Sequence, residues 1–368
     1  MPGIVHVTTV HKRNDIRIFQ KELRSLAREF GNISLVVNDG FGDSTAEGIR
    51  IIDLNIRSRS RLGRFVKPFF RLIKLVRGIK PDIIHFHDPE LILFGLVMSV
   101  LGYTLVYDAH EDVPEDILGK PWIPMILRRI TAFVFSRFER FSVRFFKAVI
   151  FVIESQLPRL GFKKNIVLHN FPILSDYTDD TVEPAEKYFI HIGTLTEVRG
   201  LNEILDALLL LPEDYSLLVA GIFSPSAFET AQQHPAWSRV RYIEWVERKK
   251  LIPLTKKAIG GLLLFHPLPN MYNSSPNKLF EYMASGIPVI CSDFPGFREV
   301  VAKNECGILV DPLDHMAISE AMDTLLRDEA ERGRMGANGL RAVRALYSWE
   351  SESRKLIGLY SDILSGKG

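Results

Sequence analysis

Cysteine is scarce in this chain, with only two among 368 residues, Cys291 and Cys306. Both lie in apolar settings, so the sequence predicts no disulfide framework and fits a reducing cytoplasm. Long hydrophobic runs are also absent, because the longest, from Leu91 to Leu101, is too short to span a bilayer and is expected to form a helix buried on a sheet. No basic and apolar leader precedes the first expected strand, so we expect no secretion.

The chain also lacks an excess of one charge, since it contains 46 Lys and Arg and 44 Asp and Glu, for a formal net charge of +2. Hydrophobic residues make up 46% of the chain and charged residues 24%, which is typical of a globular protein rather than a disordered or fibrous one. The chain is longer than one hydrophobic core usually requires, and we expect two domains.

Short apolar runs alternate with longer helical patterns along the chain, which predicts an α/β protein with parallel sheets. Two sets of six strands are expected, at Ile4–Val10, Ile33–Val37, Arg50–Leu54, Asp82–Phe86, Thr104–Tyr107, Ala148–Ile153, Tyr188–Gly193, Ser216–Gly221, Arg241–Trp245, Gly261–Phe265, Pro288–Cys291 and Gly307–Val310. Between the sets, Phe171–Lys187 is polar and acidic with two prolines, as expected of a linker. Two such sheets would enclose a ligand cleft between their strand ends.

The run SSPNKLFE, from Ser274 to Glu281, is typical of the start of a helix, with Ser275 at the N-cap and Pro276 at the first helical position. Free backbone N–H groups and the helix dipole favour a phosphate there, and Lys278 adds a cation. Glu281 offers an acceptor for sugar hydroxyls. An ordinary capped helix without a ligand is the alternative.

A second phosphate candidate is the βα turn from Gly193 to Gly200, where Arg199 could hold phosphate oxygens. Together with Lys278 it would form a two-cation clamp for a diphosphate, and a tight turn with a solvated arginine is the alternative. Trp245 and Val246 end a strand where the nucleotide base would then lie, although Trp245 could equally be a core residue.

Polar residues of the first half gather after two expected strands. His85, His87 and Asp88 lie at the end of one strand, and Asp108, His110, Glu111 and Asp112 lie at the end of the other. At the carboxyl edge of a sheet these side chains would meet an acceptor or the reacting sugar. Metal binding is an alternative, but we expect no metal because Lys and Arg can replace Mg²⁺ in stabilising a leaving phosphate. For His85 alone, a core histidine is the favoured interpretation.

Two basic segments of the first half, Arg57–Lys80 and Arg128–Lys147, interleave cations with bulky apolar residues. The first contains nine Lys or Arg and no acidic residue, and the second contains six phenylalanines and Glu139 as its one acid. Basic amphipathic helices of this kind suit an anionic membrane surface. No nucleic-acid module is visible, so nucleic acid is not an expected partner, and solvated faces over an ordinary core are the alternative.

These motifs together form a recognisable pattern. The chain resembles the retaining GT-B glycosyltransferases of family 4 over nearly its whole length, in VHKRNDIRIFQKEL, DIIHFHDPELILFG and VYDAHED of the first half and in IGTLTEVRG and SSPNKLFEYMASGIPVICSDFPGFREVV of the second. The resemblance implies two Rossmann-like domains facing across a cleft, with an acceptor-side domain at 1–170, a linker at 171–187 and a donor domain at 188–348. The remaining 349–368 is similar to the terminal helix that crosses back to the first domain.

The resemblance also assigns roles. It implies that Glu281 binds the ribose, that Arg199 and Lys278 hold the diphosphate, and that His110 faces the donor sugar near the reaction centre. The implied reaction retains the anomeric configuration and needs neither a metal nor another cofactor. The full donor-binding set is Gly193, Arg199, Trp245, Val246, Asn273, Ser274, Ser275, Lys278, Leu279 and Glu281, and His110, Arg199 and Lys278 form the catalytic set.

Three positions depart from the family pattern. Asn273 stands where relatives commonly have a Glu, and Thr194 stands where many have an Arg. The first βα turn lacks the usual glycine pair, and we expect its Asn14, Asp15 and Arg17 near the acceptor or the donor phosphate, with His87 and Asp88.

The sequence therefore predicts a cytoplasmic enzyme, bound peripherally to the inner face of the cell membrane, that moves a hexose from a UDP or GDP donor to a lipid-linked or polysaccharide acceptor. A nucleotide-sugar epimerase of the same fold is one alternative. A non-catalytic subunit that binds a nucleotide sugar at the membrane is the other.

Overall fold

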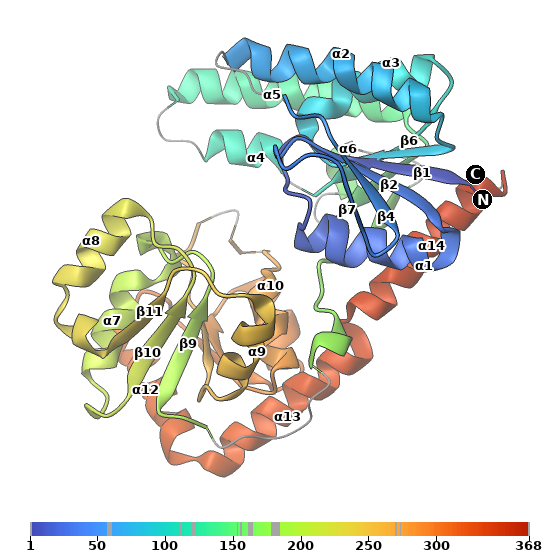
Figure 1. Cartoon of the computed structure of the whole chain (residues 1–368). Coiled ribbons are helices and arrows are strands. Elements are labelled where there is room, and N and C mark those ends of the chain that lie inside the picture. Colours follow the sequence, from blue (N-terminus) through green and yellow to red (C-terminus); the bar gives the residue numbers. More distant parts are fainter. Residues whose placement is uncertain are drawn as a thin grey trace. The chain divides into compact units, whose positions relative to one another are not determined.

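The structure is a computed structural model that describes residues 2–56, 61–110, 112–119, 123–152, 154, 157–160, 165–177, 185–268, 271–272 and 274–366, without the side chains of residues 61–68 and 159. The chain divides into two compact units (Figure 1). The first unit combines Met1–Asn170 with Glu350–Gly368, and the second is Phe171–Trp349.

The first unit contains an eight-stranded sheet whose neighbours are parallel except for the β3–β4 pair at one edge. In spatial order the strands are β3 (Ser44–Ala46), β4 (Ile49–Asp53), β2 (Asn32–Val37), β1 (Gly3–Val7), β5 (Ile83–Phe86), β6 (Thr104–Ala109), β7 (Ala148–Phe151) and β8 (Asn165–Val167). The central strands are buried along their length, which explains their continuous apolar runs.

Helices cover both faces of this sheet (Figure 1). One face is covered by α2 (Arg61–Ile79), α3 (Ile92–Val100) and α5 (Met125–Ser142), and the other by the π-helix η1 (Ile16–Leu23), α1 (Arg24–Phe30) and the last helix, α14 (Trp349–Leu364). The short helices α4 (Val113–Leu118) and α6 (Leu157–Leu160) lie in the loops. Alternate residues of β1 divide between the faces, so that Val5 and Val7 join the α2–α3 core while His6 contacts Tyr360 of α14.

The second unit contains a six-stranded, fully parallel sheet. In spatial order the strands are β11 (Val240–Ile243), β10 (Ser216–Ala220), β9 (Tyr188–Ile192), β12 (Gly261–Leu263), β13 (Val289–Ser292) and β14 (Gly307–Val310). One face packs on α7 (Leu201–Leu209), α8 (Pro225–Gln233) and α12 (His315–Arg327), and the other on α9 (Arg248–Lys256), α10 (Asn277–Ala284), α11 (Pro295–Phe297) and α13 (Glu329–Leu346).

Each sheet has a point where the strand order reverses. In the second unit the reversal lies between β9 and β12, and in the first it lies between β1 and β5. The loops after such a pair of strands leave toward opposite faces and open a crevice at the carboxyl edge, where ligands of this fold bind. Ligand sites are therefore expected at the loops after β9 and β12 and at the loops after β1 and β5.

The predicted α/β class with two parallel sheets is confirmed, and all the expected strands are present within a few residues of their predicted limits. The sequence pattern did not predict β3 and β8, which are three-residue strands at opposite edges of the first sheet. Such strands are too short to show a period of their own. Cys291 and Cys306 are buried free thiols, as predicted. None of the described helices is both long and apolar enough to cross a membrane.

Candidate functional site

The turn after β9 brings the backbone close to two cations. Gly193 has φ of 87°, in the left-handed region that favours glycine, and a Cβ at this position would lie 3.6 Å from the Lys278 Nζ. Gly200 has φ of 78°, and a Cβ there would lie 2.7 Å from the Leu264 carbonyl oxygen. Both glycines of the predicted motif are therefore required by the backbone, and α7 begins at Leu201 as expected.

Arg199 and Lys278 converge on one aromatic ring. The Arg199 guanidinium carbon lies 5.8 Å from the Phe265 ring centroid, and the Lys278 Nζ lies 5.9 Å from the same centroid. Arg199 donates to the Thr194 carbonyl oxygen at 2.9 Å, and the Lys278 Nζ lies 3.3 Å from His191 Nε2. The structure therefore brings together the two cations that the sequence predicted as a clamp.

Burial lowers the pKa of Arg199. Burial and then the Arg199 charge lower the pKa of Lys278 to about 7, while Glu281 opposes this shift. Among the described residues, neither cation forms a salt bridge with a carboxylate. Two like charges held together in a partly desolvated site are stabilised when an anion binds between them.

The start of α10 differs from the prediction. The N-cap is Pro276, with φ of −71° and ψ of 134° and no side-chain cap, so the prediction of Ser275 as N-cap is wrong. Ser274 instead donates from Oγ to the Met271 carbonyl oxygen at 2.9 Å, which closes the preceding turn. Without a side-chain cap, the first-turn amides remain available to a phosphate. Leu279 is fully buried, and its amide donates to the Pro276 carbonyl oxygen at 3.1 Å. Asn273 lies outside the described residues.

Glu281 is held by a residue that the sequence analysis missed. Arg248 donates from Nη1 to Glu281 Oε1 at 2.6 Å, and it also contacts Asp176 Oδ2 at 2.9 Å and the Tyr177 hydroxyl at 3.2 Å. The carboxylate is thus fixed through Oε1. The only sequence signal for this partner is the basic run that starts at Arg248, because the pairing depends on tertiary packing.

Trp245 and Val246 follow β11 at the carboxyl edge of the second sheet. Trp245 is 75% exposed, so the interpretation of this tryptophan as a core residue is wrong, and Val246 is half-buried. An exposed indole at this edge of the sheet is suited to stack on a base.

Arg17 of the first unit is buried and makes its hydrogen bonds within that unit. It is 6% exposed, donates to both Asp108 oxygens at 2.8 and 3.0 Å, and donates to the Leu168 carbonyl oxygen at 3.0 Å. Its Nε also lies 3.1 Å from Glu22 Oε1. Arg17 was expected near the acceptor or the donor phosphate, but its Nε, Nη1 and Nη2 all donate to groups of the first unit, so the structure gives it an internal role.

Asp15 and Asp88 support the loop after β1. Asp15 caps η1 by accepting from the Arg17 and Ile18 amides at 2.8 and 2.9 Å. Asp88 is 1% exposed, and it accepts from the Thr8 hydroxyl at 3.0 Å and from the Thr9 amide. The expected acceptor-side role of Asp88 is therefore corrected to that of a loop anchor, since its oxygens are taken by the backbone and hydroxyls of this loop.

His110 is the catalytic residue predicted in the first unit, and its side chain is 12% exposed. Its Nε2 lies 3.3 Å from His11 Nε2, and its Nδ1 lies 3.7 Å from Asp108 Oδ2. Burial lowers the pKa of His110, which favours the neutral imidazole. His87, also expected on the acceptor side, is 1% exposed and contacts His6 and Asp108. Asn14, expected on the same side, is exposed.

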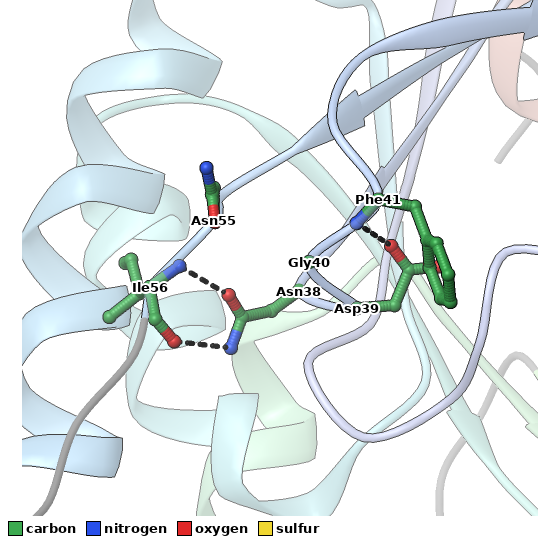
Figure 2. Close-up of a pocket in the computed structure, with 6 residues that line it drawn as sticks. All are labelled: Asn38, Asp39, Gly40, Phe41, Asn55 and Ile56. Carbon is green, nitrogen blue, oxygen red and sulfur yellow. Dashed lines mark hydrogen bonds between the residues drawn. The ribbon is translucent and has the colours of Figure 1, made fainter.

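A pocket that the sequence did not indicate lies beyond β2 and β4 (Figure 2). Asn38, Asp39, Gly40, Phe41, Asn55 and Ile56 line it. The Asn38 amide holds Ile56 by accepting from its N–H at 2.8 Å and donating to its carbonyl at 3.3 Å. Phe41 is 77% exposed beside the Arg13 guanidinium, whose carbon lies 5.4 Å from the ring centroid. This pocket belongs to the carboxyl edge of the first sheet.

Two family models match the chain. The model of glycosyl transferases group 1 matches residues 178–342, and the model of glycosyltransferase family 4 matches residues 22–160. The first match covers the Arg199–Lys278 site, and the second covers most of the first sheet.

Curated relatives extend this similarity. A phosphatidyl-myo-inositol mannosyltransferase of Mycobacterium leprae is 38% identical over 77% of this chain and 74% of its own length. An MMP alpha-(1->4)-mannosyltransferase of Mycolicibacterium hassiacum is 30% identical over 80% of this chain and 74% of its own length. The chain spans less than half the length of several other relatives that it matches.

Among solved structures, the Anabaena HepE protein in complex with UDP and glucose superposes with a TM-score of 0.72 and 14% sequence identity. The superposition covers 98% of this chain and all of the Anabaena chain. At this identity the likeness is one of fold.

Proposed function

The chain belongs to the group 1 glycosyltransferases of family 4 type, and from this premise we propose that it transfers a hexose from a nucleoside diphosphate sugar to a lipid-linked or polysaccharide acceptor. The observation that carries this proposal is the pair of cations Arg199 and Lys278 beside the uncapped start of α10. These two cations have no carboxylate partner among the described residues, and a diphosphate would supply one anionic group for each of them.

In the proposed reaction an acceptor hydroxyl attacks the anomeric carbon on the face from which the nucleotide diphosphate leaves. The bond from this carbon to the diphosphate oxygen breaks, and the hydroxyl proton passes to the leaving diphosphate. The new glycosidic bond therefore retains the anomeric configuration. Arg199, Lys278 and the first-turn amides of α10 stabilise the negative charge that develops on the leaving diphosphate. These groups take the place that a divalent metal has in other transferases, so the transfer itself proceeds without a metal. His110 faces the donor sugar in this proposal.

The donor is a UDP- or GDP-hexose. The mannosyltransferase names of two relatives and the UDP and glucose of the structural neighbour motivate a test of both bases. Glu281, which Arg248 orients, is assigned to the ribose hydroxyls that both nucleotides share. Trp245 is assigned to the base, where an exposed indole contributes stacking without selecting between uracil and guanine.

The test is a release assay in which UDP- and GDP-hexoses are incubated with the chain and with a membrane extract that contains lipid-linked acceptors. We expect nucleoside diphosphate to form with one base, and the sugar to appear in the lipid or polysaccharide fraction. Arg199→Ala protein should release less than a hundredth as much, whereas Arg241→Ala, at an exposed position of the same unit, should match the unchanged protein. Equal release by both variants would contradict the site assignment.

We also propose that the first unit docks on the inner face of the cell membrane through α5. This helix exposes an apolar surface to solvent, formed by Met125, Ile126, Leu127, Ile130, Phe133, Val134 and Phe141, each at least half exposed. Arg129, Arg137 and Arg140 are exposed on the same helix. Its one acid, Glu139, is turned inward and accepts from the Tyr107 hydroxyl at 3.0 Å.

The second basic segment therefore supports the proposal more directly than the first. Residues 57–60 of Arg57–Lys80 lie outside the described part of the chain, and Leu72 and Val76 of α2 are buried in the core. Sedimentation with phosphatidylglycerol vesicles tests the docking. Reversing the charge of Arg129, Arg137 and Arg140 should weaken binding by about 1 kcal/mol for each residue. Reversal of three exposed cations of the second unit, Arg241, Lys249 and Lys303, should change binding little, and equal losses would contradict docking through α5.

A further inference from the structure

Four fully buried side chains of the first unit, His6, Glu22, His85 and His87, converge on one point at the face of the sheet that η1 and α14 cover. We propose that they bind one Zn²⁺ ion, which holds η1 and the two central strands together. Such an ion would be structural, so the proposal is separate from the transfer reaction and does not alter its chemistry.

Strand register places the three imidazoles together. His6 of β1 lies directly opposite His85 of β5, so both side chains project from the same face of the sheet. His87 lies two residues after His85 and continues the pairing, because its amide donates to the Val7 carbonyl oxygen at 3.1 Å. Because side chains alternate between the two faces along a strand, the side chain of His87 projects from the same face as that of His85. Glu22 reaches the group from η1, and π-helical turns of this kind occur frequently at functional sites.

The distances between ligand atoms suit a tetrahedral ion. With metal–ligand bonds of about 2.1 Å, tetrahedral ligands lie about 3.4 Å apart. Here the His6 Nδ1 lies 3.0 Å from His87 Nε2, and Glu22 Oε2 lies 3.8 Å from His6 Nδ1, 3.9 Å from His87 Nε2 and 4.0 Å from His85 Nδ1. All four ligand atoms lie within 4.8 Å of one another. Three imidazoles with one carboxylate form a donor set that Zn²⁺ accepts.

The hydrogen bonds of the cluster are incomplete. Among the described residues, both Glu22 oxygens and His85 Nε2 are buried without a hydrogen-bond partner. Burying a carboxylate in this way costs several kcal/mol unless a cation or a proton compensates it. Arg17 lies 3.1 Å from Glu22 Oε1 but is paired bidentately with Asp108. One cation thus faces two buried carboxylates, and a divalent ion would supply positive charge on the histidine side of Glu22.

The surroundings resemble an outer coordination shell. His87 presents Nε2 to the cluster while its Nδ1 lies 3.2 Å from Asp108 Oδ2, and His6 presents Nδ1 while its Nε2 lies 3.1 Å from the Tyr360 hydroxyl. Metal-bound histidines commonly donate their second N–H to such partners. The Tyr360 hydroxyl also lies 2.8 Å from His85 Nδ1, so an ion bound by this nitrogen would replace that contact, and Tyr360 would keep its contact with His6 Nε2.

A second group with ligand spacing, formed by His87, Asp108 and His110, is less suitable. Both Asp108 oxygens accept from Arg17, at 2.8 and 3.0 Å. A cation at this group would have to compete with the guanidinium for the same oxygens. The group of His6, Glu22, His85 and His87 has no such competitor at Glu22 Oε2.

The test uses the full chain, expressed without a polyhistidine tag and dialysed against metal-free buffer. Elemental analysis by mass spectrometry should find close to one zinc per chain. Removal of that zinc with a strong chelator should lower the thermal midpoint, and Co²⁺ added to the stripped protein should give the visible absorption of a tetrahedral site. Less than a tenth of an equivalent of zinc, with no Co²⁺ spectrum on protein that circular dichroism shows to be folded, would overturn the proposal.

Glu22→Gln keeps the size of the side chain and removes the anionic ligand, so zinc affinity should fall at least tenfold. His234→Gln is the matched control, because His234 lies in the second unit and contacts Asp206 at 3.1 Å. The His234→Gln protein should retain the metal, and the chelator should lower its thermal midpoint as in the unchanged protein. If Glu22→Gln binds zinc as tightly as the unchanged protein, or if the chelator shifts neither protein, the cluster is a buried polar network that shares a proton, and no metal site exists.

Discussion

In the first unit, Arg17 lies under the loop after β1 with its guanidinium paired to Asp108, and in the second unit Arg199 lies after β9 on a carbonyl oxygen and an aromatic ring. Both arginines follow the first strand of their sheet, beside the point where the strand order reverses. Arg17 is paired with buried carboxylates, whereas Arg199 forms no salt bridge among the described residues, and we propose that its charge serves a ligand. In our proposal, equivalent positions in two similar sheets serve stability in the first unit and ligand binding in the second.

The difference extends to the residues around each arginine. Asp108 and Glu22 neutralise the first site, while Lys278 adds a second positive charge to the other and has its own pKa lowered to about 7. A buried lysine beside an arginine destabilises the folded state, and natural proteins accept such a cost mainly where function requires it.

The largest effect is expected at Asp108. Asp108→Asn leaves Arg17 buried with Glu22 as its one remaining carboxylate, and breaking a buried ion pair in this way should lower the free energy of unfolding by about 3–5 kcal/mol. Urea unfolding followed by circular dichroism measures this change. Asp214→Asn, which removes an exposed ion pair with Lys187, should change stability little. Comparable effects of the two substitutions would mean that Arg17 is not held as described.

Replacement of Lys278 should reduce nucleotide affinity without reducing stability. Lys278→Met removes a desolvated charge, so the thermal midpoint should stay the same or rise, while affinity for UDP or GDP should fall roughly 100-fold, or about 2.7 kcal/mol. Calorimetric titration gives the affinity and a thermal melt gives the stability. Lys303→Met, at an exposed position of the same unit, should leave both unchanged. A variant that loses stability and keeps its affinity would refute the assignment of Lys278 to the ligand.

Nucleotide binding should depend on pH through Lys278. Its pKa of about 7 in the free protein should rise when a diphosphate binds, because the anion favours the ammonium form. Binding therefore takes up a proton above pH 7, and affinity should fall by up to tenfold for each pH unit as pH increases. Lys278→Arg stays protonated and should flatten this dependence. A constant affinity from pH 6.5 to 9 in the unchanged protein would contradict the lowered pKa.

A smaller effect is expected at Glu281. Glu281→Gln should weaken UDP or GDP binding about tenfold, since it loses both the charge that Arg248 orients and the acceptor assigned to the ribose. Pyrophosphate affinity, measured in the same way, should hardly change because pyrophosphate has no ribose. Glu244→Gln, at an exposed position of the same unit, is the control. If the Gln substitution at Glu281 weakens pyrophosphate and nucleotide equally, the carboxylate acts on the phosphates or on the fold instead.

The sequence predicted much of the second unit because its signals are local. Gly193, Gly200, Arg199 and Lys278 lie in short motifs beside strand ends, and parallel strands bring such ends to one edge. Arg248 was missed, since its contacts with Glu281 and Tyr177 span 33 and 71 residues.

The first unit was less predictable because its polar residues meet through register and tertiary packing. His6 and Tyr360 are 354 residues apart, and no pattern in either segment indicates their contact. Asp88 and Arg17 were expected to face a substrate, and only the structure shows which partners occupy them. A charged residue after a buried strand predicts a position at the sheet edge, but it does not distinguish a side chain that binds a ligand from one that anchors a loop.

Whether Arg199 and Lys278 recognise a diphosphate is tested by a calorimetric comparison of UDP with UMP and of GDP with GMP. We predict that the diphosphate of the preferred base binds at least tenfold more tightly than its monophosphate, and that Lys278→Met removes most of this difference. Equal affinities for diphosphate and monophosphate in the unchanged protein would contradict the claim.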